Sequence, residues 1–535
     1  MKKIFVILIV LLCIPFQTAK AQYDINPQGI DIEMMRKVQM AQVAVSGLYV
    51  DSIDTKKLAE DAINGMLSKL DPHSTYSNAE ETKKLNEPLQ GGFGGIGIQF
   101  NMLDDSLIVI ATVPNGPSEK AGLLAGDRIV AVDGVAIAGV KMSRDTIMKK
   151  LRGEVGTKTV LTIARGSKKK HLTFKLTRGQ IPMPTLDAYY MITPEIGYIH
   201  LERFGAESDK EVRDAIKDLQ KQGMRDLILD FQYNGGGYLD AAVDIANEFL
   251  EHKDLVVFTE GLNSPRRNFY ARGGGFFRNG RVAVLVDEYT ASAAEIVSGA
   301  IQDHDRGIII GRRTFGKGLV QRPIPLPDGS MIRLTTAHYY TPSGRCIQKP
   351  YEKGKKEDYE KDIENRYNRG EFTSIDSIHL DSTKVYYTLK EHRPVYSGGG
   401  IMPDCFVPLD TTKVTKYYSK LRQTDVIINE VLRYVDNHRE YINKHYPTFA
   451  DFKASFEVPQ ALIDSVRSRG EKEKKLKPES DDEWKRTISD LRFNLKTQIA
   501  YNLWNRNEYY RFFNERSDIV KKALEMLEQK SDAKI

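Results

Sequence analysis

The sequence predicts an α/β fold joined to a separate β-rich domain, with helical segments at both ends of the chain. Between residues 181 and 350, short apolar runs rich in β-branched residues alternate with amphipathic stretches, as strands and their covering helices do. Residues 91–180 carry several alternating strand patterns separated by Gly-containing turns. Residues 22–90 and 413–535 place apolar side chains at helical spacing instead.

The length and composition of the chain limit the class of protein. At 535 residues the chain is too long for a single hydrophobic core, and about two to four domains are expected. Hydrophobic residues make up 41% and charged residues 28%, which is typical of a soluble globular protein. The formal net charge of +6 is too small to indicate a nucleic-acid partner.

Residues 1–21 have the organisation of a secretory leader. Two lysines precede an apolar run over residues 4–16, and Ala19-Lys-Ala21 is a small-x-small cleavage motif. The alternative is an uncleaved membrane anchor, but the apolar run is shorter than the roughly 20 residues that span a bilayer. We therefore predict cleavage after Ala21 and an exported, periplasmic protein, soluble or lying on a membrane. We expect no transmembrane segment in the mature chain.

The N-terminal region, residues 22–90, is predicted to be helical. Leu58, Ala62 and Met66 fall on one helical face. The segment Leu70-Asp-Pro-His-Ser-Thr-Tyr76 then ends the helix, because proline cannot continue the helical hydrogen bonding. This region either packs on the body of the protein or pairs two subunits, and the sequence leaves both alternatives open.

The β-rich domain, residues 91–180, begins with the Gly-rich turn Gly94-Gly-Ile-Gly-Ile-Gln-Phe100. Consecutive backbone N–H groups in such a turn can bind a carboxylate, and the neighbouring strand edge can accept an extended peptide. The alternatives are a plain turn and a dinucleotide-binding loop. The latter needs a helix directly after the glycines, which this sequence lacks. The expected carboxylate-binding residues are Gly95, Ile96, Gly97 and Ile98, and further strands are expected at 106–113, 128–132 and 159–165.

Residues 181–350 contain the elements expected to form the α/β core. Hydrophobic periodicity predicts two helices and three buried strands in its central part. The helices are expected at 208–221 and about 239–250, and the strands at 196–201, 226–231 and 281–286.

Two residues in this core have the chemistry of a nucleophile and its base. Ser292 stands between the strand at 281–286 and a helix that starts at Ala293, where free N–H groups can stabilise an anion. Most serines at such positions are only helix caps. Lys317 lies between two glycines, and burial there would favour its neutral form, which can take a proton from a serine hydroxyl. The alternative for Lys317 is a surface lysine in a turn.

The spacing of Ser292, Lys317 and Gln321 resembles that of the carboxyl-terminal processing peptidases, also called tail-specific proteases. The surrounding segments Thr290-Ala-Ser-Ala-Ala-Glu295, Gly311-Arg-Arg-Thr-Phe-Gly-Lys-Gly318 and Gly398-Gly-Gly-Ile-Met-Pro-Asp404 are also similar. The resemblance implies a crotonase-like serine protease core over 181–350 and 385–412, with an inserted PDZ domain at 91–180. It implies that Ser292 is the nucleophile, Lys317 the general base and Gln321 the residue that orients the lysine.

The segment Asn234-Gly-Gly-Gly237 resembles the oxyanion loop of this family, with Gly235 where proline or serine often stands. By that resemblance the backbone N–H groups of Gly236 and Ala293 are the expected oxyanion donors. A turn that merely needs glycine is the alternative. Asp303 is a further candidate to support Lys317. Glu295, one helical turn from Ser292, is expected to shape the site.

The predicted function is that of an exported serine endopeptidase that cleaves proteins near their C-termini, with the PDZ domain binding the substrate tail or gating the site. One alternative is a catalytically silent PDZ scaffold. Another is a Ser-His hydrolase on the same fold, using His338 or His304. His304 falls at the end of the helix after Ser292, roughly 18 Å along its axis, which is too far for a direct hydrogen bond.

The remaining segments give weaker signals. Residues 351–384 are predicted to be a charged insertion or a surface arm. Residues 413–535 are predicted to be a helical region with one apolar stripe, formed by Leu491, Leu495, Ile499 and Leu503. Cys346 and Cys405 remain after cleavage of the leader, and the sequence does not show whether they pair. No cofactor and no metal are expected. The expected partners are substrates with apolar C-terminal tails, a second copy of the chain through the helical ends, and an adaptor protein.

Overall fold

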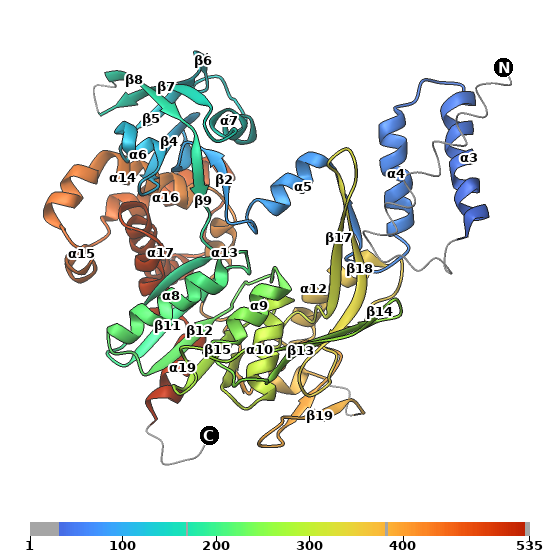
Figure 1. Cartoon of the computed structure of the whole chain (residues 1–535). Helices are drawn as coiled ribbons and strands as arrows, with labels where there is room; N and C mark the ends of the chain where they lie inside the picture. Colours follow the sequence, from blue (N-terminus) through green and yellow to red (C-terminus); the bar gives the residue numbers. More distant parts are fainter. Residues whose placement is uncertain (1–30, 167–169, 380–382, 530–535) are drawn as a thin grey trace.

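The computed structural model describes residues 31–166, 170–379 and 383–529 (Figure 1). The predicted leader, residues 1–21, lies outside these residues. Within the described ranges, no helix combines the length and the apolar composition needed to cross a bilayer.

A six-stranded sheet forms the centre of the protein. Its order is β10-β11-β12-β15-β16-β21, with β10 antiparallel to β11 and all other neighbours parallel. The three core strands expected from the sequence are confirmed to within one residue as β11, β12 and β15, because each is an apolar run buried on both faces. The strands are β10 Leu186–Met191, β11 Ile196–Leu201, β12 Asp226–Asp230, β15 Val282–Val286, β16 Ile308–Gly311 and β21 Cys405–Phe406.

Helices cover both faces of this sheet. On one face lie α8 (Ser208–Lys221), α9 (Leu239–Ala246) and α10 (Ala293–Asp303), which share one hydrophobic core with β11, β12 and β15. The bounds of α8 are those expected from the sequence. The other face is covered by α19 (Asp518–Glu528), so this C-terminal helix completes the α/β core.

A second sheet lies beside the first and places the loop that carries Lys317. Its order is β1-β18-β13-β14, and β17 also pairs with β18. The pairing of β1 with β18 brings the segment after the N-terminal helices against residues 331–333. The strands are β1 Thr75–Ser77, β13 Leu255–Gly261, β14 Ser264–Tyr270, β17 Leu319–Pro325 and β18 Met331–Tyr340.

The β-rich domain forms its own sheet, β3-β4-β5-β7-β8, with β6 paired to β5. Its chain connections to the core run through a two-stranded ribbon of β2 and β9. Two helices, α6 and α7, pack on this sheet and share its core. The bounds are β2 Gly92–Gly95, β3 Ile98–Leu103, β4 Ser106–Thr112, β5 Arg128–Val132, β6 Val135–Ala136, α6 Pro117–Ala121, α7 Arg144–Leu151, β7 Lys158–Arg165, β8 Lys170–Thr177 and β9 Gly179–Pro182.

The two helical ends differ in how they pack. The N-terminal helices α3 (Ile32–Leu48) and α4 (Thr55–Leu67) stand apart on one side of the molecule in Figure 1, and α3 has no buried residue. A third helix, α5 (Ala79–Asn86), and the strand β1 complete the region predicted to be helical. The alternatives of packing on the body and pairing two subunits remain open for α3.

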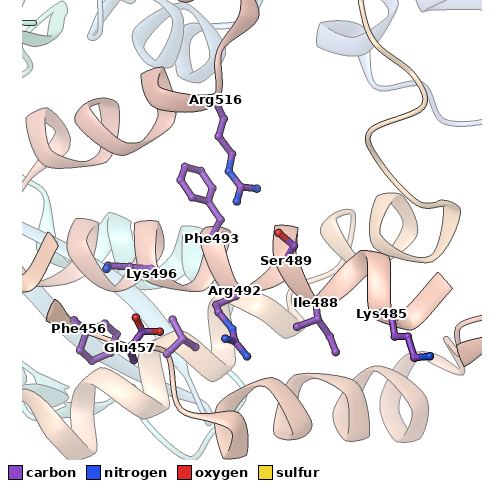
Figure 2. Close-up of a pocket in the computed structure, with 10 residues that line it drawn as sticks. Phe456, Glu457, Lys485, Ile488, Ser489, Arg492, Phe493, Lys496 and Arg516 are labelled. Carbon is purple, nitrogen blue, oxygen red and sulfur yellow. The ribbon is translucent and has the colours of Figure 1, made fainter. Parts of the chain in front are cut away.

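The C-terminal region folds around a core of its own, and Figure 1 shows it beside the β-rich domain. In the predicted stripe, Leu491, Leu495 and Ile499 are fully buried in that core, so these three are not available to join subunits. Leu503 packs partly buried against the same core. A hollow of about 440 Å³ opens on this region, lined by α17, residues 456–458 and Arg516 (Figure 2). The helices are α13 Lys416–Arg422, α14 Val426–His445, α15 Phe449–Ser455, α16 Gln460–Lys474, α17 Asp481–Leu503 and α18 Arg506–Arg516.

The segment predicted as a charged insertion, 351–384, is not simply a surface arm. It contains the short helices α11 (Lys356–Glu360) and α12 (Asp362–Asn368). Arg366 of α12 is 1% exposed and donates to the carbonyl oxygens of Thr314 at 3.0 Å and Arg313 at 2.6 Å. Its burial lowers the pKa of the guanidinium to about 10. The segment therefore supports the loop that leads to Lys317.

Candidate active site

Ser292 occupies a strained turn between β15 and α10. Its backbone has φ 58° and ψ −117°, a left-handed conformation that non-glycine residues rarely adopt. The preceding turn is fixed by Asp287, whose carboxylate accepts the N–H groups of Tyr289 and Thr290, both at 3.0 Å. Burial raises the pKa of Asp287 to about 6. Strain held in place by such a network is a feature of functional sites.

Glu295 connects the serine turn to the lysine loop. Its side chain is fully buried, and its Oε2 accepts the backbone N–H groups of Ser292 at 2.8 Å and Lys317 at 2.9 Å. Its Oε1 accepts the N–H of Gly316 at 2.7 Å and the hydroxyl of Thr314 at 2.5 Å. Burial raises the pKa of Glu295, and these donors act in the opposite direction. One carboxylate therefore sets the relative position of the two expected catalytic residues.

Lys317 lies on the loop between β16 and β17, packed between neighbouring segments. Gly318 is in tight contact with the backbone of Gln348, so a Cβ at Gly318 would lie 2.8 Å from the Gln348 nitrogen. Burial lowers the pKa of Lys317, and the charge of Arg333 lowers it further, while Glu295 acts in the opposite direction. The lysine is thus displaced toward the neutral form that a general base requires.

Tyr339 connects the turn at Ser292 with the loop that carries Lys317. Its side chain is 2% exposed, and its hydroxyl is 2.5 Å from the carbonyl oxygen of Lys317 and 3.1 Å from that of Ser292. Nothing in the local sequence of β18 marks this tyrosine, because its role depends on the approach of two distant loops.

Gln321 lies in β17 and is bonded to the neighbouring strand. Its Nε2 donates to the carbonyl oxygen of Leu319 at 3.1 Å and to the hydroxyl of Thr335 at 3.3 Å. The Thr335 hydroxyl donates in turn to Asp71 at 2.8 Å. The described hydrogen bonds of the Gln321 amide therefore lead through Thr335 to Asp71. The role of Gln321 in orienting Lys317 stays a prediction.

The segment 70–76 thus reaches the catalytic side of the protein. Beside Asp71, His73 has its pKa lowered to about 4, first by burial and then by the charge of Lys317. Its Nε2 lies 3.0 Å from the Tyr359 hydroxyl. A hollow of about 510 Å³ opens here between residues 67–74 and 354–360. The clustering of Asp71 and His73 near Lys317 could not be inferred from the sequence alone.

The expected oxyanion loop lies against Ser292. Gly236 has φ +94°, and a Cβ on it would fall 2.7 Å from Ser292 Cβ and 2.9 Å from the nitrogen of Ala293. Only glycine allows this approach. The N–H of Gly236 donates to Oδ1 of Asn234 at 2.8 Å. One of the two expected donors is therefore engaged within its own loop in this conformation.

Asp303 is not a support for Lys317, contrary to the sequence-based expectation. It ends α10, eleven residues beyond Ser292, or about 16 Å along the helix. Its buried carboxylate accepts Arg345 at 2.7 Å and the N–H of Ser343 at 2.9 Å. Its partners, Arg345 and Ser343, thus lie in the turn that follows β18.

The two histidines considered as alternatives have partners elsewhere. His304 Nε2 lies 2.8 Å from the carbonyl oxygen of Leu255. His338 Nδ1 lies 4.0 Å from the sulfur of Cys346. Cys346 is a free thiol, as is Cys405. In the described ranges, no cluster of three or more His, Cys, Asp or Glu side chains could hold a metal ion.

The expected carboxylate-binding turn of the β-rich domain leads into the edge strand of its sheet. Residues 95–98 connect β2 to β3, and β3 is the edge strand of its sheet. The carbonyl oxygens of Ile96 and Gly97 accept the N–H groups of Ser118 and Val113 at 2.9 and 3.0 Å, which anchors the turn. The edge of β3 and the turn together form the kind of site that binds an extended peptide end.

Comparisons with known proteins agree with the peptidase family and the PDZ domain predicted from the sequence motifs. Residues 195–361 match peptidase family S41, residues 94–176 a PDZ domain, and residues 15–82 the activating protease CtpB N-terminal domain. Residues 417–505 match a family of unknown function, DUF8443.

Two curated relatives and one solved structure illustrate the similarity. A carboxy-terminal-processing protease of Bartonella bacilliformis is 39% identical over 304 residues, 56% of this chain and 69% of the relative. The carboxy-terminal processing protease CtpB of Bacillus subtilis is 32% identical over 336 residues, 62% of this chain and 69% of the relative. A photosystem II D1 C-terminal processing protease is 26% identical with a TM-score of 0.35, covering 71% of this chain and 94% of that one. The chain therefore belongs to peptidase family S41 and is a carboxy-terminal processing serine protease with a PDZ domain.

Proposed function

We propose that the protein hydrolyses peptide bonds near the C-termini of exported proteins through an acyl-enzyme on Ser292. The observation that carries this proposal is the shared carboxylate of Glu295, which bonds the backbone of both Ser292 and Lys317. A serine and a partly buried lysine held this way have the chemistry of a Ser-Lys dyad.

In the acylation step, neutral Lys317 accepts the hydroxyl proton of Ser292 while Oγ attacks the carbonyl carbon of the substrate. The resulting ammonium group gives that proton to the nitrogen of the departing peptide as the C–N bond breaks. A water molecule then loses a proton to Lys317 and attacks the ester carbon. As the ester C–O bond breaks, the ammonium of Lys317 gives that proton to Oγ of Ser292, which releases the new carboxyl end and restores both residues. Burial supports this cycle, because it lowers the pKa of Lys317.

The tetrahedral oxyanion would be bound by the N–H groups of Ala293 and Gly236. Each such donor typically contributes about 2.7–4 kcal/mol of transition-state stabilisation. Because Gly236 donates to Asn234 in the described conformation, its peptide group has to turn before it can serve. Gln321 is proposed to orient Lys317 and is itself held by Thr335.

The PDZ domain is proposed to bind the substrate tail, with the terminal carboxylate at residues 95–98 and the tail added along β3. PDZ domains bind peptide C-termini, and the free edge of β3 supports this placement. We also propose that the α/β core is of the crotonase-like class. We further propose that the leader is cleaved after Ala21 and that the protein is periplasmic, on the pattern of residues 1–21.

The Ser-His alternative has less support. His304 is hydrogen-bonded to the carbonyl oxygen of Leu255. His338 lies against the sulfur of Cys346. By contrast, the backbone of Lys317 shares a carboxylate with that of Ser292. A silent scaffold would not need a nucleophile held in a strained backbone conformation.

The test is cleavage of an unfolded reporter with an apolar C-terminal tail by the mature chain and by variants Ser292→Ala and Lys317→Ala. We expect cleavage by the wild type and by the control Lys353→Ala, an exposed lysine of the same region, and none by the two dyad variants. Substantial activity in Lys317→Ala would refute the dyad and favour the histidines. No cleavage by the wild type, even with a tail peptide added in trans, would favour the scaffold.

A further inference from the structure

The C-terminal helical region covers a face of the PDZ sheet that would otherwise be apolar and exposed. Along β4, Leu107 and Val109 point into the PDZ core, whereas Ile108 and Ile110 belong to a separate cluster on the opposite face. An uncovered apolar face of this kind marks an interaction surface. Here Leu432 of α14, 2% exposed, packs on it. The cluster consists of Leu103, Ile108, Ile110, Ile428 and Leu432.

Two ion pairs fix the position of α14 on this face. Arg128 of β5 bonds Asp436 at 2.7 Å, and both side chains are less than a quarter exposed. Arg433 bonds Asp104, which follows β3, at 2.6 Å. The Arg433 guanidinium lowers the pKa of Asp104. The contact therefore has an apolar centre flanked by two specific charge pairs, which gives it a defined orientation.

A further attachment of the PDZ domain is the ribbon of β2 and β9, whose base lies against the protease core. The carbonyl oxygen of Leu89 accepts the N–H of Ala206 at 2.8 Å. Gly205 is packed so closely here that a Cβ on it would lie 3.0 Å from that same oxygen. A change in the direction of the ribbon must therefore move residues 204–206.

Residues 204–206 are bonded in turn to the oxyanion loop. Phe204 donates its N–H to the carbonyl oxygen of Gly236 at 3.0 Å, and its own carbonyl oxygen accepts the N–H of Tyr238 at 2.8 Å. The N–H of Gly236, on the same residue, donates to Asn234. A short series of backbone contacts thus connects the base of the PDZ ribbon to the peptide groups of Gly236.

We propose that the C-terminal helical region is a latch that binds the PDZ domain and holds the protease in a resting state. While α14 holds the PDZ sheet, the ribbon and Phe204 keep the Gly236 N–H on Asn234. A substrate tail that adds to β3, the strand leading into the Asp104 contact, draws the PDZ domain off α14 and frees that N–H for the oxyanion. This inference rests on the proposed function of Gly236 and of the PDZ domain, and it gives residues 417–505 a role.

Charge exchange across the Arg128–Asp436 pair tests the latch. Arg128→Asp and Asp436→Arg each place like charges in contact, and each is expected to raise cleavage of a tail-less unfolded reporter on the order of tenfold. The double variant restores the pair and is expected to return the rate to that of the wild type. The matched control is Arg516→Glu, which breaks the 2.8 Å pair with Asp490 in the same region without touching the PDZ domain, and it should leave the rate unchanged.

A binding measurement makes the test independent of catalysis. In a Ser292→Ala background, the affinity of a labelled apolar tail peptide should rise in the single variants and return to the wild-type value in the double variant, because a tail and α14 that oppose each other on the PDZ domain are coupled in binding free energy. Leu432→Ala provides a milder release of the latch if a charge variant fails to fold, as judged by its melting temperature.

The latch would be overturned if both single variants and Leu432→Ala cleaved the tail-less reporter at the wild-type rate and bound the tail peptide with the wild-type affinity. Rates that fall in the single variants and recover in the double variant would also overturn it, because α14 would then be a support for the active state. If the wild type cleaves no reporter, the proposed function fails, and the affinity measurement still decides whether α14 opposes tail binding.

Discussion

The backbone N–H groups of Ser292 and Lys317 donate to the same oxygen atom, Oε2 of Glu295, at 2.8 and 2.9 Å. The relative position of the proposed nucleophile and the proposed base is thus set through main-chain atoms by a third, fully buried residue. Side-chain rotation alone cannot separate the two residues while this carboxylate is in place.

Replacing Glu295 with glutamine should therefore damage catalysis and stability together. A glutamine has one acceptor oxygen, so the N–H groups bonded to the other oxygen of Glu295 lose a partner. A buried group left unsatisfied costs about 1–3 kcal/mol, and a displacement near 1 Å can reduce the rate about 100-fold. We expect kcat/KM to fall by roughly that factor and the melting temperature to drop. Steady-state kinetics within twofold of wild type would contradict this role, and the exposed Glu251→Gln serves as control.

Arg333 should influence the pH dependence of the reaction. The activity requires neutral Lys317, so the rate rises as pH increases through the lowered pKa of this lysine. After burial, the charge of Arg333 is the largest cause that lowers that pKa. Arg333→Gln removes a like charge, which raises the pKa of Lys317 and moves the acid limb of the pH–rate profile to higher pH. The exposed Arg225→Gln should leave the profile in place; an unmoved profile in Arg333→Gln would exclude the effect.

Lys317→Met should abolish activity and yet stabilise the fold at neutral pH. The folded-state pKa of Lys317 is lowered, so the unfolded chain binds more protons and stability rises with pH between the folded and unfolded pKa values. At pH values below this window, the buried ammonium lowers the free energy of unfolding of the wild type by the largest amount. The methionine variant should therefore exceed the wild type in free energy of unfolding most at these pH values. The difference should vanish as the pH approaches about 10.4, the ordinary lysine pKa. Chemical denaturation across pH measures it; a variant less stable than wild type at neutral pH would contradict the burial argument.

Gly236→Ala should inactivate the enzyme, whereas Gly235→Ala should be tolerated. A Cβ at Gly236 would approach Ser292 Cβ to 2.7 Å and the Ala291 oxygen to 2.8 Å, in a left-handed backbone conformation. A Cβ at Gly235 would meet nothing within 4 Å. We expect a loss in kcat of at least about 100-fold for the first, comparable to removing an oxyanion donor, and a change of a few-fold for the second. Equal losses in both variants would show that general flexibility of the loop matters more than the close approach of Gly236.

Tyr339→Phe should lower kcat with little effect on KM. The hydroxyl lies within hydrogen-bond distance of the carbonyl oxygens of Ser292 and Lys317, and it makes no expected contact with the substrate. Loss of one such bond, worth about 1–1.5 kcal/mol, corresponds to a rate loss of roughly tenfold. The neighbouring Tyr340→Phe is the matched control, since Tyr340 stacks on Phe258 instead. A changed KM with unchanged kcat would place Tyr339 in substrate binding.

Local pattern was enough to predict much of the fold. The helix at 208–221 and the strands at 196–201, 226–231 and 281–286 follow from hydrophobic periodicity over about ten residues, which does not depend on the rest of the chain. The packing of the charged segment 351–384 could not be predicted in this way. Arg366 has the composition of a surface residue and becomes buried only because the carbonyl oxygens of Arg313 and Thr314 accept its guanidinium.

The sequence by itself determined the family and proposed Ser292, Lys317 and Gln321, because these residues stand in short motifs whose order and spacing are read directly. The tertiary structure decided what holds them. Thr335 bonds Asp71 across 264 residues of sequence. Asp303 accepts a hydrogen bond from Arg345, although the sequence suggested Lys317 as its partner. Contacts of this kind depend on how the chain runs between distant segments. The engagement of the Gly236 N–H with Asn234 also belongs to the folded loop, because glycine allows both this orientation and the one that binds an oxyanion.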